Sequence, residues 1–203
     1  MNPHKKIAFI GAGNMARAMI GGLIKNGFPV DHIWASSPNV QKHEAIKSKF
    51  SIHLTSDNVE AAKHADIIVF AVKPWVMETV CAELKKVIQD KNPLIISLVT
   101  GTQIASMTNW LSHPHCALIR TMPNIASAVG AGATGLFANP HTTSDQKDFA
   151  ESLFRSVGAA DSPDISFDRS QFLAGVGIQL WRRCRSNARN RSFDCENDSG
   201  EKI

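Results

Sequence analysis

The feature that most constrains the fold is a glycine turn close to the start of the chain. Residues 6–16 read KIAFIGAGNMA, so a short apolar run stops at Gly11 and Gly13 and a helical pattern follows at once. A dinucleotide-binding βαβ unit requires this order of strand, turn and helix. Gly11 permits the tight turn, Gly13 lets the backbone approach a pyrophosphate, and Ala16 takes the small third position. The alternative is a purely structural turn. The prediction is a dinucleotide site at Gly11, Ala12, Gly13, Asn14 and Met15.

Strand-like and helix-like segments alternate through most of the chain. Apolar or β-branched runs after the glycine turn predict strands at 32–35, 51–54, 65–72, 93–97, 116–120, 133–138 and 157–160. Amphipathic spacing predicts helices at 15–24, 40–49, 75–88, 103–111 and 144–154. The alternation predicts an α/β fold: a Rossmann-like, doubly wound, mostly parallel sheet with flanking helices. Its ligand crevice is expected at the carboxyl ends of the strands.

This pattern ends near residue 165. We expect residues 1–165 to form an NAD(P)-binding Rossmann-like domain and residues 166–203 to be an irregular or disordered tail, because residues 182–191 show no apolar period. Most of the arginines lie beyond residue 168, so the net charge of +4 does not indicate a nucleic-acid partner. A basic arm that binds anionic partners is the alternative for this segment.

Composition also argues against a membrane or a metal as a partner. No apolar run reaches the ~20 residues that a membrane span needs. The four cysteines form no CxxC pair, which favours a reduced, cytoplasmic setting. His113, His115 and Cys116 stand close together, but no carboxylate or second cluster accompanies them. We therefore expect no metal site there.

The residues at the end of the second expected strand bear on the type of cofactor. An NAD site places an acidic residue there to accept hydrogen bonds from the ribose 2′-hydroxyl. The sequence at 35–39 is ASSPN, without a carboxylate. Ser36 and Ser37 leave room for a 2′-phosphate and can donate to it, and Lys42 adds positive charge. NADP is therefore favoured and NAD is the alternative, although the same residues are also typical of a simple turn.

Two further turns follow expected strands at the same edge of the sheet. Ala71, Val72, Lys73 and Pro74 form the first, where proline favours an extended Lys73 that either faces the cofactor or is simply exposed. The second follows Arg120 and Thr121, beside the expected position of a nicotinamide ring. It contains Met122, Pro123 and Asn124.

These motifs, with GAGAT at 130–134, together resemble Δ1-pyrroline-5-carboxylate reductase. The resemblance covers roughly residues 5–168. It implies hydride transfer from NAD(P)H to a cyclic imine, the last step of proline biosynthesis. It also implies cofactor contacts from Gly11 to Met15, from Ser36 and Asn58, and from Ala71 to Pro74, with Met122 to Asn124 bordering the nicotinamide. Ile125 departs from the threonine usual after this motif.

The end of the chain departs further from this family. The family continues into a helical domain that opens with a GSGPAY-like turn, carries an SPGGTT-like segment, builds the dimer and holds the substrate. Here AGVGI at 174–178 only echoes the first motif, and the chain has no tyrosine. Our hypothesis is a reading frame disrupted near residues 168–180. Low activity and loss of the family's homo-oligomer are then expected.

The expected activity needs little acid–base machinery, because a protonated imine is already electrophilic. The protein mainly positions the two reactants, so we name no catalytic residue. One rival is a catalytically inactive NADP-binding fragment. Another is an NADP oxidoreductase of the β-hydroxyacid-dehydrogenase-like superfamily, which expects a lysine on a helix after the nucleotide domain. No lysine lies between Lys147 and Lys202.

Overall fold

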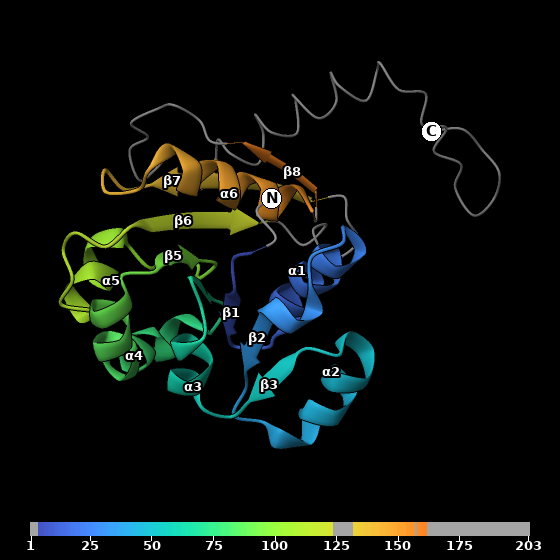
Figure 1. Ribbon diagram of the computed structural model, residues 1–203. Helices are drawn as coiled ribbons and strands as arrows, with labels where there is room; N and C mark the ends of the chain where they lie inside the picture. The colour runs from blue at the N-terminus through green and yellow to red at the C-terminus, as the bar shows by residue number, and fades with distance from the viewer. Residues whose placement is uncertain (1–3, 124–131, 157, 162–203) are drawn as a thin grey trace, which may run out of the picture. The chain divides into compact units, whose positions relative to one another are not determined.

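The fold centres on one mixed sheet of eight strands, seen in a computed structural model that describes residues 4–123, 132–156 and 158–161 (Figure 1). The chain divides into two units at Pro163, and every described residue lies in the first. The strand order is β3-β2-β1-β4-β5-β6-β7-β8, and only β6 and β7 pair antiparallel. The strands are β1 Ile7–Ile10, β2 Ile33–Ser36, β3 His53–Thr55, β4 Ile67–Phe70, β5 Leu94–Ser97, β6 Leu118–Pro123, β7 Gly132–Ala138 and β8 Gly158–Asp161. The expected doubly wound, mostly parallel sheet is confirmed. The tail expected at 166–203 lies outside the described residues.

Six α-helices flank the described sheet: α1 Asn14–Lys25, α2 His43–Phe50, α3 Asn58–Lys63, α4 Met77–Lys91, α5 Ile104–Trp110 and α6 Ser144–Arg155. Two of the predicted helices differ at their starts. Short 3₁₀ turns, η2 Val40–Lys42 and η3 Pro74–Val76, precede α2 and α4, while η1 Val30–His32 precedes β2. None of the helices in the described residues is long and apolar enough to span a bilayer.

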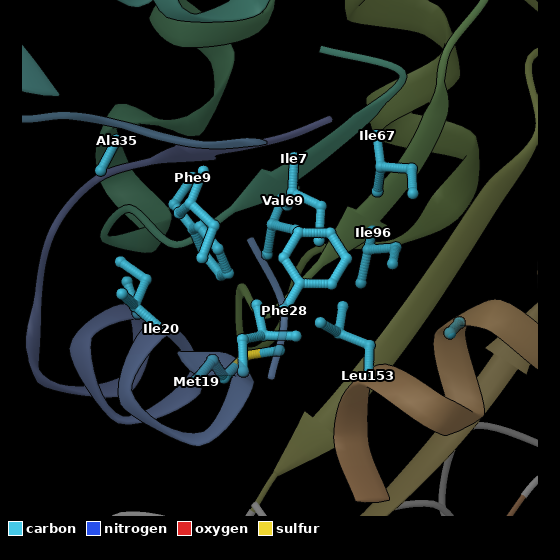
Figure 2. Close-up of a cluster of buried hydrophobic side chains, with 14 of the residues drawn as sticks. Ile7, Phe9, Met19, Ile20, Phe28, Ala35, Ile67, Val69, Ile96 and Leu153 are labelled. Carbon is cyan, nitrogen blue, oxygen red and sulfur yellow. The ribbon is translucent and has the colours of Figure 1, made fainter. Parts of the chain in front are cut away.

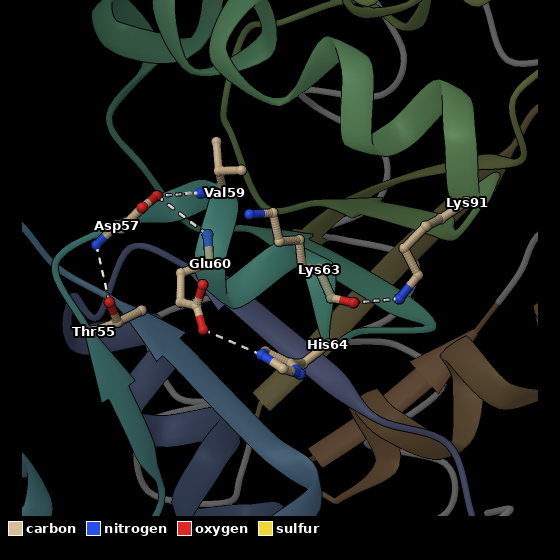
Figure 3. A network of polar contacts seen from close by, with 7 residues as sticks. All are labelled: Thr55, Asp57, Val59, Glu60, Lys63, His64 and Lys91. Atoms are coloured by element: carbon tan, nitrogen blue, oxygen red, sulfur yellow. Dashed lines mark hydrogen bonds and ion pairs between the residues drawn. The ribbon is translucent and has the colours of Figure 1, made fainter.

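Helix α3 was not among the predicted helices. It has six residues, too few to show a helical period, but its start carries a sequence signal. The Asp57 carboxylate accepts hydrogen bonds from the N–H groups of Val59 and Glu60 at 2.8 and 3.1 Å (Figure 3). These bonds satisfy donors left free at a helix N-terminus, which makes Asp57 an N-cap.

The core has two layers, one on each face of the sheet. Helices α1, α2 and α6 cover one face, where Phe9, Met19, Val69 and Leu153 pack together (Figure 2). Helices α3, α4 and α5 cover the other face, over apolar side chains that include Phe70. Strands buried on both faces need apolar residues, which explains the uninterrupted apolar runs of β1 and β4 and the three apolar residues that open β5.

The second layer contains two buried free thiols, Cys81 and Cys116. Burial, and then proximity to Cys116 and Glu78, raises the pKa of the Cys81 thiol from 9.0 to about 12. The unfolded chain therefore releases this proton at a lower pH than the folded chain. The associated stability is complete below pH 9 and is lost as the pH rises toward 12.

We therefore expect urea unfolding to show a steeper alkaline loss of stability for the wild type than for Cys81→Ala. The difference between pH 9 and pH 12 should be about 1–3 kcal/mol. Taking the difference between the two proteins cancels every pH-dependent contribution that they share. Parallel curves would show that the Cys81 thiolate is accommodated in the fold.

Candidate dinucleotide site

The carboxyl ends of the parallel strands lie side by side at one edge of the sheet. Ile10 pairs in register with Ser36 on one side and with Phe70 on the other, and Ser97 continues the row. The turns that follow these residues therefore share this edge. The chain leaves β1 for β2 on one side and returns to β4 on the other, so the strand order reverses between β1 and β4. Open α/β sheets bind ligands at this switch point.

Gly11 makes the turn at the switch point and is required by the fold itself. Its φ of +99° lies in the left-handed region. Its N–H donates to the Ser36 carbonyl oxygen at 3.1 Å. A Cβ at Gly11 would lie 2.7 Å from the Ala71 carbonyl oxygen. The tight turn predicted for Gly11 is confirmed, and it draws β1, β2 and the end of β4 together.

Gly13 differs from Gly11, because no atom of the described residues fills the space beside it. It is the N-cap of α1 in an extended conformation, and a Cβ there would meet no atom within 4 Å. Glycine has no side chain that could accept a hydrogen bond from the first helical N–H groups, and the first turn of α1 has no acidic residue. The described residues therefore leave space beside Gly13, where a 12-residue helix begins with its N–H groups and positive dipole end at the switch point.

The serines at the end of β2 are largely buried. Ser36 is 0% exposed, and its hydroxyl donates to Asn58 Oδ1 at 2.7 Å. Ser37 is 9% exposed, and its carbonyl oxygen lies 2.8 Å from Nε2 of His43. Direct donation from Ser36 to a 2′-phosphate requires its hydroxyl to leave Asn58. That contact therefore stays a prediction.

The turn after β4 has the predicted backbone. Lys73 is extended (φ −75°, ψ 148°) because Pro74 follows it, and Pro74 opens η3. The Lys73 ammonium lies 4.9 Å from the centroid of the Trp75 ring, which is 74% exposed. Lys73 is thus exposed beside the switch point with an aromatic partner.

The third predicted turn is wrong for its first residues, because β6 continues through Met122 and Pro123, which pair with β7. Burial lowers the pKa of Arg120, which pairs in register with Ser97. Met122 is half-buried on β6, Pro123 ends that strand, and Asn124 lies outside the described residues. Sequence reasoning missed Glu83 of α4, whose carboxylate accepts a hydrogen bond from the Asn58 amide at 2.8 Å. Its position on the polar face of an amphipathic helix gives no local signal.

The histidines near 113 do not complete a metal centre in the described part of the chain. His115 Nδ1 and His141 Nε2 lie 3.4 Å apart, and His113 Nε2 lies 3.2 Å from Asn92 Oδ1. Within residues 4–123, 132–156 and 158–161, no three His, Cys, Asp or Glu side chains are grouped so as to hold a metal ion.

The sheet order and the glycine turn define a Rossmann-like protein of the dinucleotide-binding class. A family model described as "NADP oxidoreductase coenzyme F420-dependent" matches residues 6–101. Pyrroline-5-carboxylate reductases from Vibrio alginolyticus and Pseudomonas aeruginosa are 43% and 39% identical over 155 residues. In both cases the match covers 76% of this chain and 56% of the relative, so the chain spans little more than half of their length.

Solved structures agree with these matches. A pyrroline-5-carboxylate reductase from Coxiella burnetii superposes with a TM-score of 0.79 at 36% identity, covering 92% of this chain and 71% of that one. A Plasmodium falciparum pyrroline carboxylate reductase with NADP bound gives 0.72 at 22% identity, covering 94% and 72%, and supports the fold alone. The chain belongs to the pyrroline-5-carboxylate reductase family.

Proposed function

We propose that the chain binds NADP(H) at the switch point between β1 and β4. The observation that carries the proposal is the open space beside Gly13 at the start of α1, next to a Gly11 turn that the fold itself requires. Pyrophosphate oxygens in that space would accept hydrogen bonds from the N–H groups of the first helical turn. The NADP bound to the Plasmodium falciparum relative and the description of the matching family model favour the phosphorylated cofactor.

We further propose the family's reaction, reduction of 1-pyrroline-5-carboxylate to L-proline, at low activity. NADPH bound at the switch point would supply the hydride for the carbon of the substrate C=N bond. The chain's own residues would bind and orient the cofactor: Gly13 and Asn14 would hold the phosphates, and Lys73, Pro74 and Met122 would hold the remainder. The protonated imine needs no further acid, so these roles are positional.

Two rival functions differ in what they predict. A catalytically inactive NADP-binding fragment would bind the cofactor without turnover. Another NADP oxidoreductase of the β-hydroxyacid-dehydrogenase-like superfamily would oxidise a hydroxy acid and be inert toward the imine. Family membership favours the imine as substrate over a hydroxy acid.

Cofactor binding is tested by titrating the purified 203-residue chain with NADPH and with NADH. Saturable binding is expected, tighter for NADPH, because the end of β2 places no carboxylate against a 2′-phosphate. Adenosine 2′,5′-bisphosphate should compete for the site more strongly than 5′-AMP. Absence of NADPH binding at millimolar concentration would refute the proposal, and equal affinities would refute the preference for NADP.

A further inference from the structure

A line of hydrogen bonds runs from helix α4 to the glycine turn. The Asn58 amide donates to Glu83 Oε2 at 2.8 Å and accepts from the Ser36 hydroxyl at 2.7 Å. The Ser36 Oγ in turn lies 3.4 Å from the backbone nitrogen of Gly11, whose N–H also donates to the Ser36 carbonyl oxygen at 3.1 Å. Glu83 is exposed and Asn58 is half-buried, whereas Ser36 is fully buried. A surface carboxylate is thus linked in three steps to the backbone at the switch point.

The chemistry of these groups determines which of them donates and which accepts along the line of hydrogen bonds. A carboxylate only accepts hydrogen bonds, so the Asn58 side chain must turn its NH₂ toward Glu83 and its oxygen toward Ser36. The Ser36 proton is then committed to Asn58, and a lone pair of the hydroxyl oxygen is left as a second acceptor for the Gly11 N–H, beside the Ser36 carbonyl oxygen. Without the carboxylate, the amide of Asn58 has two orientations of similar energy. A bond to an ionised group is also the stronger kind, so Glu83 determines which orientation is occupied.

A second contact between helices α3 and α4 serves as a control for a purely structural role of Glu83. Helices α3 and α4 are also joined at their far ends, where the Lys91 ammonium donates to the Lys63 carbonyl oxygen at 2.6 Å (Figure 3). Both contacts connect the same two helices, one at the first residue of α3 and the other at its last. Only the contact made by Glu83 leads on to Ser36 and Gly11.

We propose that Glu83 is a positioning residue for the cofactor site. It fixes the orientation of the Asn58 amide and, through Ser36, the geometry of the Gly11 turn that receives the dinucleotide. The inference rests on the proposed NADP(H) binding and adds a residue outside the strand-end turns. Supporting groups of this kind hold a binding constellation close to its productive geometry.

The direction of the change in NADPH affinity when Glu83 is removed distinguishes an electrostatic effect from a positioning effect. Loss of a negative charge near an anionic ligand should strengthen binding if only long-range electrostatics act. Loss of the group that orients Asn58 should weaken binding. A weaker complex after removal of a negative charge is therefore specific to positioning.

The experiment compares NADPH affinity and thermal midpoint for the wild type, Glu83→Ala, Glu83→Gln and Lys91→Met. Glu83→Ala should weaken binding about fivefold or more, with a thermal midpoint close to that of the wild type because Glu83 is exposed. Glu83→Gln keeps the reach of the side chain, but its amide donates as well as accepts and no longer fixes the Asn58 orientation, so it should recover only part of the loss. Lys91→Met should bind normally. Equal or tighter binding by Glu83→Ala, or an equal loss in Lys91→Met, would overturn the proposal.

A measurement without cofactor keeps this inference separate from the proposed function. In ¹H–¹⁵N spectra, the Asn58 side-chain amide and the Gly11 N–H should shift in Glu83→Ala and stay in place in Lys91→Met. If the wild type fails to bind NADPH, the proposed function fails, while these shifts still test the line of hydrogen bonds from Glu83 to Gly11. Unmoved signals in Glu83→Ala would remove Glu83 from the site.

Discussion

A Gly11→Ala variant is expected to lose about 2–4 kcal/mol of folding stability. Two costs combine at this position. A methyl group at a φ of +99° is strained, and it would lie 2.7 Å from the Ala71 carbonyl oxygen. That oxygen belongs to the backbone at the end of β4, so relief requires the central strands to move apart. Urea unfolding monitored by circular dichroism measures the loss.

Gly13→Val is the matched variant two residues along. The structure leaves open space there, so stability should change by no more than about 1 kcal/mol, the cost of a poor N-cap residue. The isopropyl group would instead occupy the space proposed for the pyrophosphate. NADPH binding should weaken at least tenfold, which corresponds to about 1.4 kcal/mol.

The two glycines thus separate a requirement of folding from a requirement of binding. A stable Gly13→Val variant that binds NADPH as tightly as the wild type would reject the phosphate site at α1. A Gly11→Ala variant of undiminished stability would show that the ends of β1 and β4 separate without cost. Measuring both quantities on both variants prevents a folding defect from being read as a binding defect.

The fold could be predicted from the sequence because its strongest local patterns agree with one another. The apolar runs of β1 and β4 have the length and β-branched content of buried parallel strands, and the glycine turn stands between strand and helix. Helix α3 was not predicted because its six residues make fewer than two turns, too few to show a helical period. Its start at Asp57, with Glu60 three residues later, was a signal that a search for helix caps would have found.

The candidate site was less accessible to sequence reasoning. The order of strands and turns locates the edge where ligands bind, but it does not say which way a strand-end side chain points. Ser36 is fully buried with Asn58 as its partner, so the contact predicted between its hydroxyl and a 2′-phosphate stays a prediction. The role proposed for Glu83 depends on helix α4 packing beside α3, a tertiary contact between residues 25 positions apart. No local pattern encodes such a contact.

A polypeptide of these 203 residues is expected to bind NADPH but to reduce 1-pyrroline-5-carboxylate far more slowly than an ordinary enzyme. The match to the Vibrio alginolyticus reductase covers 155 residues and 56% of that protein. By the resemblance, the substrate carboxylate is held by a helical domain whose motifs are not recognisable beyond residue 168. Correct positioning of two reactants lowers a barrier by up to ~7–11 kcal/mol. Loss of even half of that would slow turnover about a thousandfold.

The measurement is NADPH oxidation by the purified chain with and without 1-pyrroline-5-carboxylate, with Gly13→Val as the control for turnover at the proposed site. Sedimentation of the same sample reports whether the family's stable dimer forms, which we do not expect. Turnover near the ~10 per second typical of enzymes would contradict the prediction. Such a rate would mean that residues 166–203, or a second copy of the chain, supply the groups that hold the substrate. A binding-competent chain with a rate at the level of the control would instead favour the NADP-binding fragment over the reductase.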